Sequence, residues 1–250
     1  MQKRAITRCP GQSYKKCISS HPELASLSLR NAIDQHRTYV GILAELGIDL
    51  IELPPEDNMP DSCFVEDTVV IFNDIALITR PKYESRRMET ESIAEVLSDH
   101  MSVVFTKSPA TLEGGDVIHL EKSLISGSTE RTNELGIATM QKELGCKVGV
   151  VEDKSIVHLK SYVTYLGEGC FLGIEKYQNQ PVFDGYRYLV IPQSESYASN
   201  TLTVNSTVII PKGYPHTKQL LTENGFDTIT LDTKEFARCE GALTCLSIIF

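Results

Sequence analysis

The sequence predicts an α/β fold of five ββαβ repeats, arranged as a pseudo-symmetric five-bladed propeller. Three junctions share one pattern, in which a helical stretch ends near a glycine and a strand follows: residues 45–49, 143–147 and 223–227. A glycine after the last helical turn takes the left-handed conformation that ends a helix. Two weaker junctions, near Asp99 and Asp184, lie between these three, so the 250 residues divide into five units of about 50 residues.

Within each unit, the alternation of apolar residues predicts two short strands, a helix and a third strand, in that order. The expected helices cover residues 24–46, 84–98, 132–144 and 216–223. The expected strands cover residues 63–72, 75–79, 103–105, 116–120, 123–126, 147–151, 201–204, 208–210 and 228–231. No linker or low-complexity segment interrupts this pattern, so one domain is expected over residues 1–250.

The composition excludes several classes of protein. The 33 acidic residues outnumber the 24 lysines and arginines and give a formal charge of −9. This excess opposes nonspecific binding to nucleic acid, which needs a basic surface, and it is compatible with a small cationic substrate. No apolar run approaches the roughly 18 residues of a membrane helix, and the apolar stretch after Arg4 is too short for a signal peptide. We therefore expect a cytoplasmic protein that has neither nucleic acid nor membrane as a partner.

The cysteines do not form a metal-binding or disulfide pattern. There are seven, an odd number, so they cannot all pair within the chain. No Cys-x-x-Cys occurs, and no cysteine and histidine group has the spacing of a zinc site. We expect reduced, mostly buried thiols and no bound metal.

Acidic residues gather at the start of two predicted strands, where a propeller would bring loops around an axial pocket. Asp61 and Asp67 flank Phe64, and strand alternation would place these two acids on one face. Such a group could hold a cation, or it could be a solvated turn. Glu113 and Asp116 flank a pair of glycines, which permits either a close backbone approach or a tight turn.

Four further residues are candidates on weaker grounds. His158 lies near the start of a strand, and Cys245 lies in the apolar C-terminal segment. A histidine, an acid and a cysteine form the pattern of a thiol nucleophile, although either residue could be structural. Arg86 and Arg131 stand at predicted helix starts, where the helix dipole disfavours a cation, and this placement hints at an anion to bind.

These clusters, in this order, resemble the dimethylarginine dimethylaminohydrolase family of the guanidino-group-modifying, or pentein, superfamily. The similar stretches lie at residues 64–67, 76–81, 85–87, 112–117, 131–133, 158–161 and 243–245. The resemblance implies a five-bladed ββαβ propeller, in agreement with the repeat count. It also implies hydrolysis of N-omega-methylated arginines to citrulline and dimethylamine or methylamine, through a covalent cysteine intermediate and without a metal or organic cofactor.

The resemblance implies a role for each matching residue. Cys245 is the expected nucleophile, His158 the general acid and base, and Glu113 the acid that supports the histidine. Asp67, with Glu66, is expected to hold the guanidinium group.

The same resemblance implies the remaining substrate contacts, all expected to bind a small cationic amino acid. Asp61 matches a residue near the α-amino group, and Arg86 and Arg131 match the pair that binds the α-carboxylate. Further expected contacts are Cys239, Glu240, Phe64 and Tyr14. Tyr14 lies in a segment over residues 10–18 that is similar in place to a substrate lid, where the family often has leucine.

Two alternatives remain open at this stage. An arginine deiminase would carry an aspartate two residues after the histidine, but Lys160 stands there, which leaves one guanidinium nitrogen free to carry methyl groups. A non-catalytic binder of cationic amino acids would need neither Cys245 nor His158. A homodimer is a further expectation.

Overall fold

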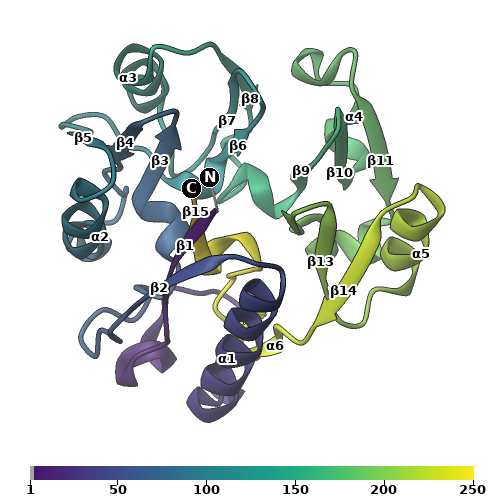
Figure 1. Ribbon diagram of the computed structural model, residues 1–250, viewed down its shortest axis with the longest axis horizontal. Helices are drawn as coiled ribbons and strands as arrows, with labels where there is room; N and C mark the ends of the chain where they lie inside the picture. The colour runs from purple at the N-terminus through teal and green to yellow at the C-terminus, as the bar shows by residue number, and fades with distance from the viewer. Residues whose placement is uncertain (1–2) are drawn as a thin grey trace. The chain divides into compact units, whose positions relative to one another are not determined.

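The chain of this computed structural model is described over residues 3–250 (Figure 1). It forms two compact units: residues up to Val65 together with Thr201–Phe250 form the first, and Glu66–Asn200 form the second. The described residues contain five three-stranded sheets, two in the first unit and three in the second. The single domain predicted over residues 1–250 stays a prediction.

Every sheet has the same topology, which the sheet of β3 (Val69–Phe72), β4 (Ile75–Ile78) and β5 (Ser102–Phe105) illustrates. β3 pairs with β4 antiparallel, and β4 pairs with β5 parallel. Parallel neighbours need a crossover connection, and helix α2 (Glu89–Ser98) makes it and packs on β4 and β5 (Figure 1). This arrangement is the predicted ββαβ repeat.

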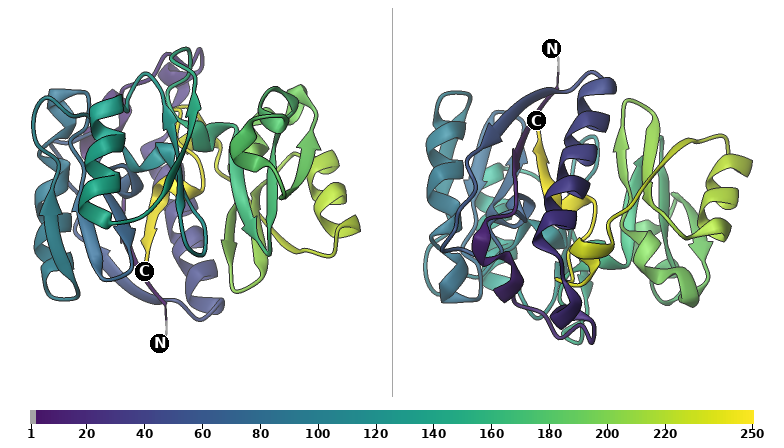
Figure 2. Two further views of the ribbon diagram at one scale, coloured as in Figure 1. Left: turned by 90° about the horizontal axis from the view of Figure 1, so that it is seen from above. Right: turned by 90° about the horizontal axis from the view of Figure 1, so that it is seen from below.

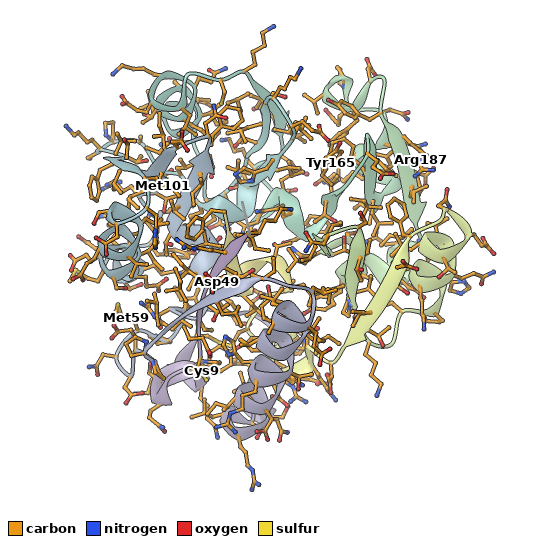
Figure 3. All side chains as sticks on the ribbon, viewed as in Figure 1. Cys9, Asp49, Met59, Met101, Tyr165 and Arg187 are labelled. Atoms are coloured by element: carbon orange, nitrogen blue, oxygen red, sulfur yellow. A yellow bond between two sulfur atoms is a disulfide. The ribbon has the colours of Figure 1, made fainter. Side chains whose placement is uncertain are left out.

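The second unit contains two more such repeats. The first comprises β6 (Val117–His119), β7 (Leu124–Ser128), α3 (Glu134–Leu144) and β8 (Val148–Glu152). The next comprises β9 (Val163–Gly167), β10 (Cys170–Ile174), α4 (Glu175–Gln178) and β11 (Arg187–Ile191). The side chains of Tyr165 and Arg187 mark the two strands on either side of β10 (Figure 3), and Arg187 Nε lies 3.2 Å from Cys170 Sγ.

A continuous apolar core holds the first two sheets of this unit and α3 together. Val70, Leu77, Leu124, Ile137 and Met140 are all buried in it. Burial of side chains of this size contributes about 1.5–3 kcal/mol each. In residues 3–250, no helix is long and apolar enough to cross a membrane.

The first unit contains the remaining two sheets. One has β12 (Leu202–Val204), β13 (Thr207–Pro211), α5 (Pro215–Glu223) and β14 (Asp227–Leu231). The other has β15 (Ser247–Ile249), β1 (Arg4–Arg8), α1 (Leu29–Glu45) and β2 (Asp49–Leu53), and the short helix α6 (Lys234–Ala237) precedes β15. The C-terminal strand therefore completes the N-terminal repeat, which the sequence analysis did not assign.

Helix α1 packs beside this C-terminal strand. In the right-hand view of Figure 2 the helix lies along the yellow C-terminal segment, and the Tyr39 hydroxyl lies 2.7 Å from Ser247 Oγ. β1 and β15 pair antiparallel, and the Arg4 amide donates to the Phe250 carbonyl at 2.8 Å. The two ends of the chain are thus held together at β15, the strand that follows the candidate nucleophile Cys245.

The helix-ending glycines are confirmed, but three element boundaries were wrong. Gly47, Gly145 and Gly225 have φ of +82°, +62° and +86°. The helix expected over 24–46 begins at Leu29, because the Ser28 side chain caps it by accepting from the Asn31 amide. The strand expected over 63–72 begins only at Val69, because a turn of 3-10 helix (Val65–Thr68) precedes it. The helix expected over 84–98 begins only at Glu89, because another such turn (Glu84–Arg86) precedes it.

The expectation that the cysteines are all reduced was wrong for one pair. Cys17 and Cys239 form a disulfide, with Cα atoms 5.9 Å apart and a sequence separation of 222. The five other cysteines are free. Sequence spacing could not indicate this pair, because the fold alone brings the two loops of the first unit together.

Candidate active site

Each unit carries part of the predicted site. The second unit carries the ionisable group of Glu66, Asp67, Arg86, Glu113, Arg131 and His158. The first unit carries Tyr14, Asp61, Phe64, Cys239, Glu240 and Cys245.

His158 and Glu113 form a buried pair in the second unit. Each residue stands just before a single turn of 3-10 helix, Leu159–Ser161 for the histidine and Gly114–Asp116 for the acid. His158 Nε2 lies 2.8 Å from Glu113 Oε2, and the Glu113 side chain is 0 % exposed. Burial lowers the pKa of His158, but the carboxylates of Asp67, Glu113 and Asp116 outweigh burial and raise it to about 9. The imidazole is therefore protonated at neutral pH and donates to Glu113.

Asp67 lies beside this pair, on the 3-10 turn that precedes β3. Its Oδ1 accepts from the Gly115 amide at 3.0 Å, and its Oδ2 accepts from Arg86 Nη1 at 2.8 Å. Burial raises the pKa of Asp67, but the cations of His158 and Arg86 lower it to about 2, so the carboxylate is ionised. A Cβ on Gly115 would lie 2.6 Å from His158 Nδ1 and 2.7 Å from Asp67 Oδ1. The glycine pair therefore permits a close backbone approach, as one of the two interpretations from sequence proposed.

Arg86 is held by carboxylates on several sides. Its Nη2 lies 2.9 Å from Glu89 Oε2, its Nη1 binds Asp67, and Nη1 lies 3.8 Å from Glu113 Oε2. Burial lowers the pKa of Arg86, but these carboxylates raise it well above its ordinary value. Sequence reasoning missed Glu89; the available signal was an acid three residues after an arginine, which places both on one helical face. The unfavourable position of Arg86 at a helix start is thus offset by Glu89.

Arg131 is the less constrained of the two arginines. Its Nη1 lies 3.4 Å from Glu113 Oε2, and its guanidinium stacks 4.2 Å above the centre of the Tyr83 ring. Its Nε is buried without a hydrogen-bond partner. Arg131 does not open helix α3, as the sequence suggested, because Asn133 caps the helix and accepts from the Gly136 amide.

Glu66 is paired with Lys160. The Lys160 ammonium donates to Glu66 Oε1, and the two side chains are 9 % and 14 % exposed. Glu66 therefore lies next to Asp67 in the chain but is neutralised by its own cation. Lys160 was considered from sequence only as the residue that replaces a deiminase aspartate, and its partner could not be read from the spacing.

The donor set of Asp67, Glu113 and His158 could in principle bind a metal, because one ligand atom from each lies within 4.8 Å of the others. The charges around it favour another use. The imidazole is protonated at neutral pH and so offers no lone pair at Nε2, and two guanidinium groups already face the carboxylates. The group is better suited to holding protons and polar substrates.

Cys245 lies in the first unit, on the 3-10 turn Thr244–Leu246 that directly precedes β15. It is 9 % exposed and belongs to the same apolar cluster as Leu243 and Leu246. Strand β15 fixes this turn from one side by pairing with β1. The thiol is therefore held on a rigid element rather than on a free C-terminal tail.

The segment compared with a lid is firmly packed in the first unit. Tyr14 is 0 % exposed, its ring lies 6.1 Å from that of Phe64, and its hydroxyl donates to the Glu235 carbonyl at 3.3 Å. Phe64 is also buried, and a Cβ on Gly241 would lie 2.2 Å from its ring. Both aromatic side chains contribute to the core of the first unit.

Three predicted contact residues hold the end of this segment and the residues just after it. The Asp61 carboxylate accepts from the Ile18 amide at 3.2 and 3.3 Å. Glu240 Oε1 accepts from the Ser20 hydroxyl at 2.6 Å, and Cys239 is bonded to Cys17. The prediction that Asp61 shares a strand face with Asp67 was wrong, because β3 begins only at Val69.

Comparison with known proteins identifies the family. The sequence model of the family described as "N,N dimethylarginine dimethylhydrolase, eukaryotic" matches residues 15–172. The N(G),N(G)-dimethylarginine dimethylaminohydrolase of Pseudomonas aeruginosa is 35 % identical over 256 residues, which cover all of both chains. This chain belongs to the dimethylarginine dimethylaminohydrolase family. The predicted family and enzyme class are confirmed.

Solved structures confirm the predicted fold class, the α/β propeller of ββαβ repeats. A mutant of the Pseudomonas aeruginosa enzyme in complex with citrulline has a TM-score of 0.95 at 34 % identity, with 100 % of both chains covered. The N-terminal domain of ArgZ, an arginine dihydrolase from cyanobacteria, has a TM-score of 0.90 at 18 % identity and covers 100 % of this chain and 97 % of that one. The second likeness concerns the fold alone.

Proposed function

We propose that this chain hydrolyses asymmetric dimethylarginine and monomethylarginine to citrulline, with release of dimethylamine or methylamine. Family membership supports the reaction, and the similar Pseudomonas aeruginosa mutant was solved with citrulline. The observation on which the proposal depends most is the buried pair of His158 and Glu113, whose Nε2 and Oε2 atoms lie 2.8 Å apart. An imidazolium with a pKa of about 9 is suited to donate a proton to a departing amine.

The proposed roles follow from the chemistry of a guanidinium. Its carbon is a weak electrophile, because the positive charge is delocalised. The Cys245 thiolate, a stronger nucleophile than a hydroxyl, attacks this carbon and forms a tetrahedral adduct. His158 then gives its proton to the alkylamine, the carbon–nitrogen bond breaks, and an S-alkylthiouronium remains on the sulfur. His158, now neutral, takes a proton from water, which attacks the same carbon and releases citrulline and the thiolate.

The substrate-binding roles are proposals on the same basis. Asp67, with Glu66, is assigned to the guanidinium, since an ionised carboxylate both attracts and orients a planar cation. Arg131, whose Nε has no hydrogen-bond partner, and Arg86 are assigned to the α-carboxylate. Asp61 is assigned to the α-amino group.

The remaining proposed contacts lie in the first unit. They are Tyr14, Phe64, Cys239 and Glu240. Tyr14 lies in the segment over residues 10–18. Phe64 packs against Tyr14, Cys239 is bonded to Cys17, and Glu240 accepts from Ser20 just after the segment, which suits them to shape the pocket through it.

A citrulline assay tests the function. Asymmetric dimethylarginine, monomethylarginine and arginine are compared with the wild-type chain, and the amine released is identified alongside citrulline. Citrulline with dimethylamine from the first substrate is the expected result. Ammonia from arginine as the main activity would instead support a deiminase, and binding of all three without product would support a non-catalytic binder.

The cellular location and the assembly are also proposals. We propose a cytoplasmic protein, since five of seven cysteines form no disulfide. Among the described residues, the Cys17–Cys239 disulfide is the feature that opposes this location. Localisation of a tagged chain tests this. A homodimer is proposed as well, and sedimentation equilibrium decides between one and two copies.

A further inference from the structure

Asp116 closes the motif that begins with Glu113, and apart from helping to raise the pKa of His158 it is given no part in the reaction described above. Its carboxylate is completely buried and connects three segments of the second unit. Oδ1 accepts from the Leu159 amide at 2.9 Å, and Oδ2 accepts from the Thr129 hydroxyl at 2.8 Å. Its own amide donates to the Glu113 carbonyl at 3.1 Å.

Each of these segments carries one side chain of the ionisable group. Leu159 directly follows His158, and Thr129 lies two residues before Arg131. Glu113 lies three residues before Asp116, on the same turn. The Asp116 carboxylate thus binds the neighbours of His158 and Arg131 in the chain, and the Asp116 amide binds Glu113 itself. The carboxylate touches none of the reacting atoms that the proposed mechanism assigns.

The hydrogen-bond directions require a carboxylate at this position. The Thr129 oxygen accepts from the Arg131 amide at 3.1 Å and from the Thr132 amide at 3.4 Å, which uses both of its lone pairs. Its hydroxyl can therefore only donate to Asp116. Leu159 also offers a donor, so both oxygens of residue 116 must accept. An asparagine has only one accepting oxygen. Its amide group would therefore face either the Leu159 amide, which is also a donor, or the Thr129 oxygen, which has no free lone pair.

The surroundings leave little freedom for another arrangement. A Cβ on Gly127 would lie 2.7 Å from Asp116 Oδ1, so the β7 backbone closes one side. Burial raises the pKa of Asp116 to about 6, which leaves it ionised, and therefore able to accept at both oxygens, at neutral pH and above.

We propose that Asp116 is a positioning residue: through Oδ1 it fixes the turn that carries His158 against the turn that carries Glu113, and the Thr129 bond to Oδ2 holds the carboxylate in the orientation that this requires. The inference deepens the proposed function, since it depends on His158 acting as the acid and base. A small misplacement of a catalytic group reduces the rate of the chemical step by as much as about 100-fold. Loss of this link should therefore reduce kcat far more than it raises KM.

The experiment compares steady-state kinetics of folded variants on asymmetric dimethylarginine. Asp116→Asn, which keeps size and shape, should lower kcat by about 10- to 100-fold with KM changed less than about threefold. Thr129→Val should lower kcat as well, whereas Thr129→Ser, which keeps the hydroxyl, should stay within about twofold of wild type. The double variant Asp116→Asn with Thr129→Val should lose much less than the product of the two single losses, because both changes break one link.

The matched control is Tyr177→Phe, which removes a hydroxyl-to-carboxylate hydrogen bond of 2.7 Å to Asp153 in the same unit. It should lower thermal stability but leave kcat unchanged. A folded Asp116→Asn variant with wild-type kcat would overturn the proposal, as would an equal loss in Tyr177→Phe. If Asp116→Asn does not fold, the threonine pair decides: unchanged kcat in Thr129→Val, or equal losses in both threonine variants, overturns the proposal.

A variant of the histidine separates this inference from the proposed function. His158→Asn should be inactive. If it turns over normally, the assignment of the acid and base fails, whatever Asp116 does. If it is inactive while Asp116→Asn and Thr129→Val are fully active, only the positioning role fails.

Discussion

The hydrogen bond between Glu113 and His158 controls the protonation state of the imidazole, and the Glu113→Gln variant tests this control. In the wild type, Glu113 Oε1 accepts from the Lys82 amide at 3.0 Å, while Oε2 faces His158 at 2.8 Å. A glutamine that keeps its carbonyl oxygen on Lys82 must turn its amide group toward His158. That amide is a donor, so the imidazole is favoured in its neutral form, with Nε2 as the acceptor.

The magnitude follows from the lost bond. A hydrogen bond to a charged group contributes about 1.5–3 kcal/mol, and 1.36 kcal/mol corresponds to one pKa unit. Glu113→Gln should therefore lower the pKa of His158 from about 9 by about one to two units. The basic limb of the kcat profile reports the acid that protonates the amine, so it should shift down by the same amount.

The assay is citrulline formation from asymmetric dimethylarginine between pH 6 and 10, with Glu121→Gln as the control. Glu121 is a carboxylate of the same unit that accepts from the Tyr165 hydroxyl at 2.6 Å, and its removal should leave the basic limb in place. An unchanged basic limb in Glu113→Gln would refute the reasoning, because the carboxylate would then not be what raises the pKa of His158.

The same pair predicts how stability depends on pH. The folded pKa of about 9 lies above the ordinary 6.5. This contribution to stability is therefore complete below pH 6.5 and is lost as the pH rises through 9. The thermal unfolding temperature of the wild type should fall across that window, and in Glu113→Gln the fall should be smaller and end at lower pH.

Three further variants test other parts of the site. Cys245→Ser should lower kcat by more than about 100-fold while asymmetric dimethylarginine still binds, measured by calorimetry; retained turnover would place the nucleophile elsewhere. Arg131→Ala should raise KM about 10- to 150-fold for amino-acid substrates but not for a guanidine that lacks the α-carboxylate. An equal rise in KM for both kinds of substrate would show that Arg131 does not bind the α-carboxylate. Lys160→Met should lower the free energy of unfolding by about 1–3 kcal/mol, because it removes the cation that pairs with the partly buried Glu66, and adding Glu66→Gln should restore part of it; additive losses in urea unfolding would contradict the pairing.

The repeats could be predicted from the sequence because their signals are local. A glycine in the left-handed conformation directly after a helical pattern ends the helix, and Gly47, Gly145 and Gly225 all do so. The boundaries that failed depend on hydrogen bonds outside the local pattern. Apolar periodicity alone could not place the start of α1, which is decided by the Ser28 cap.

The closure of the N-terminal repeat failed for a different reason. β1 finds its antiparallel partner in β15, at the opposite end of the chain. No periodicity links two segments so far apart, and the same holds for the bond between Cys17 and Cys239. Sequence reasoning finds elements within one stretch of chain, whereas these contacts arise only when the complete unit is folded.

The charge of the whole chain is a poor guide to the charge of the site. The formal charge of −9 was compatible with a small cationic substrate. In the ionisable group of the second unit, however, the carboxylates are paired with cations: Glu66 with Lys160, Asp67 and Glu89 with Arg86, and Glu113 with Arg131 and the protonated His158.

This local balance has a consequence for how a substrate would bind. A guanidinium that approaches Asp67 competes with Arg86 for the same carboxylate, rather than entering an empty acidic pocket. An α-carboxylate that binds Arg86 or Arg131 draws those cations away from Asp67 and Glu113. The two charged ends of one amino acid would thus assist each other, since each end frees the partner that the other requires. A guanidine that lacks the carboxylate should therefore bind more weakly than the loss of one ion pair alone would predict. It must displace Arg86 from Asp67 without the help of a carboxylate.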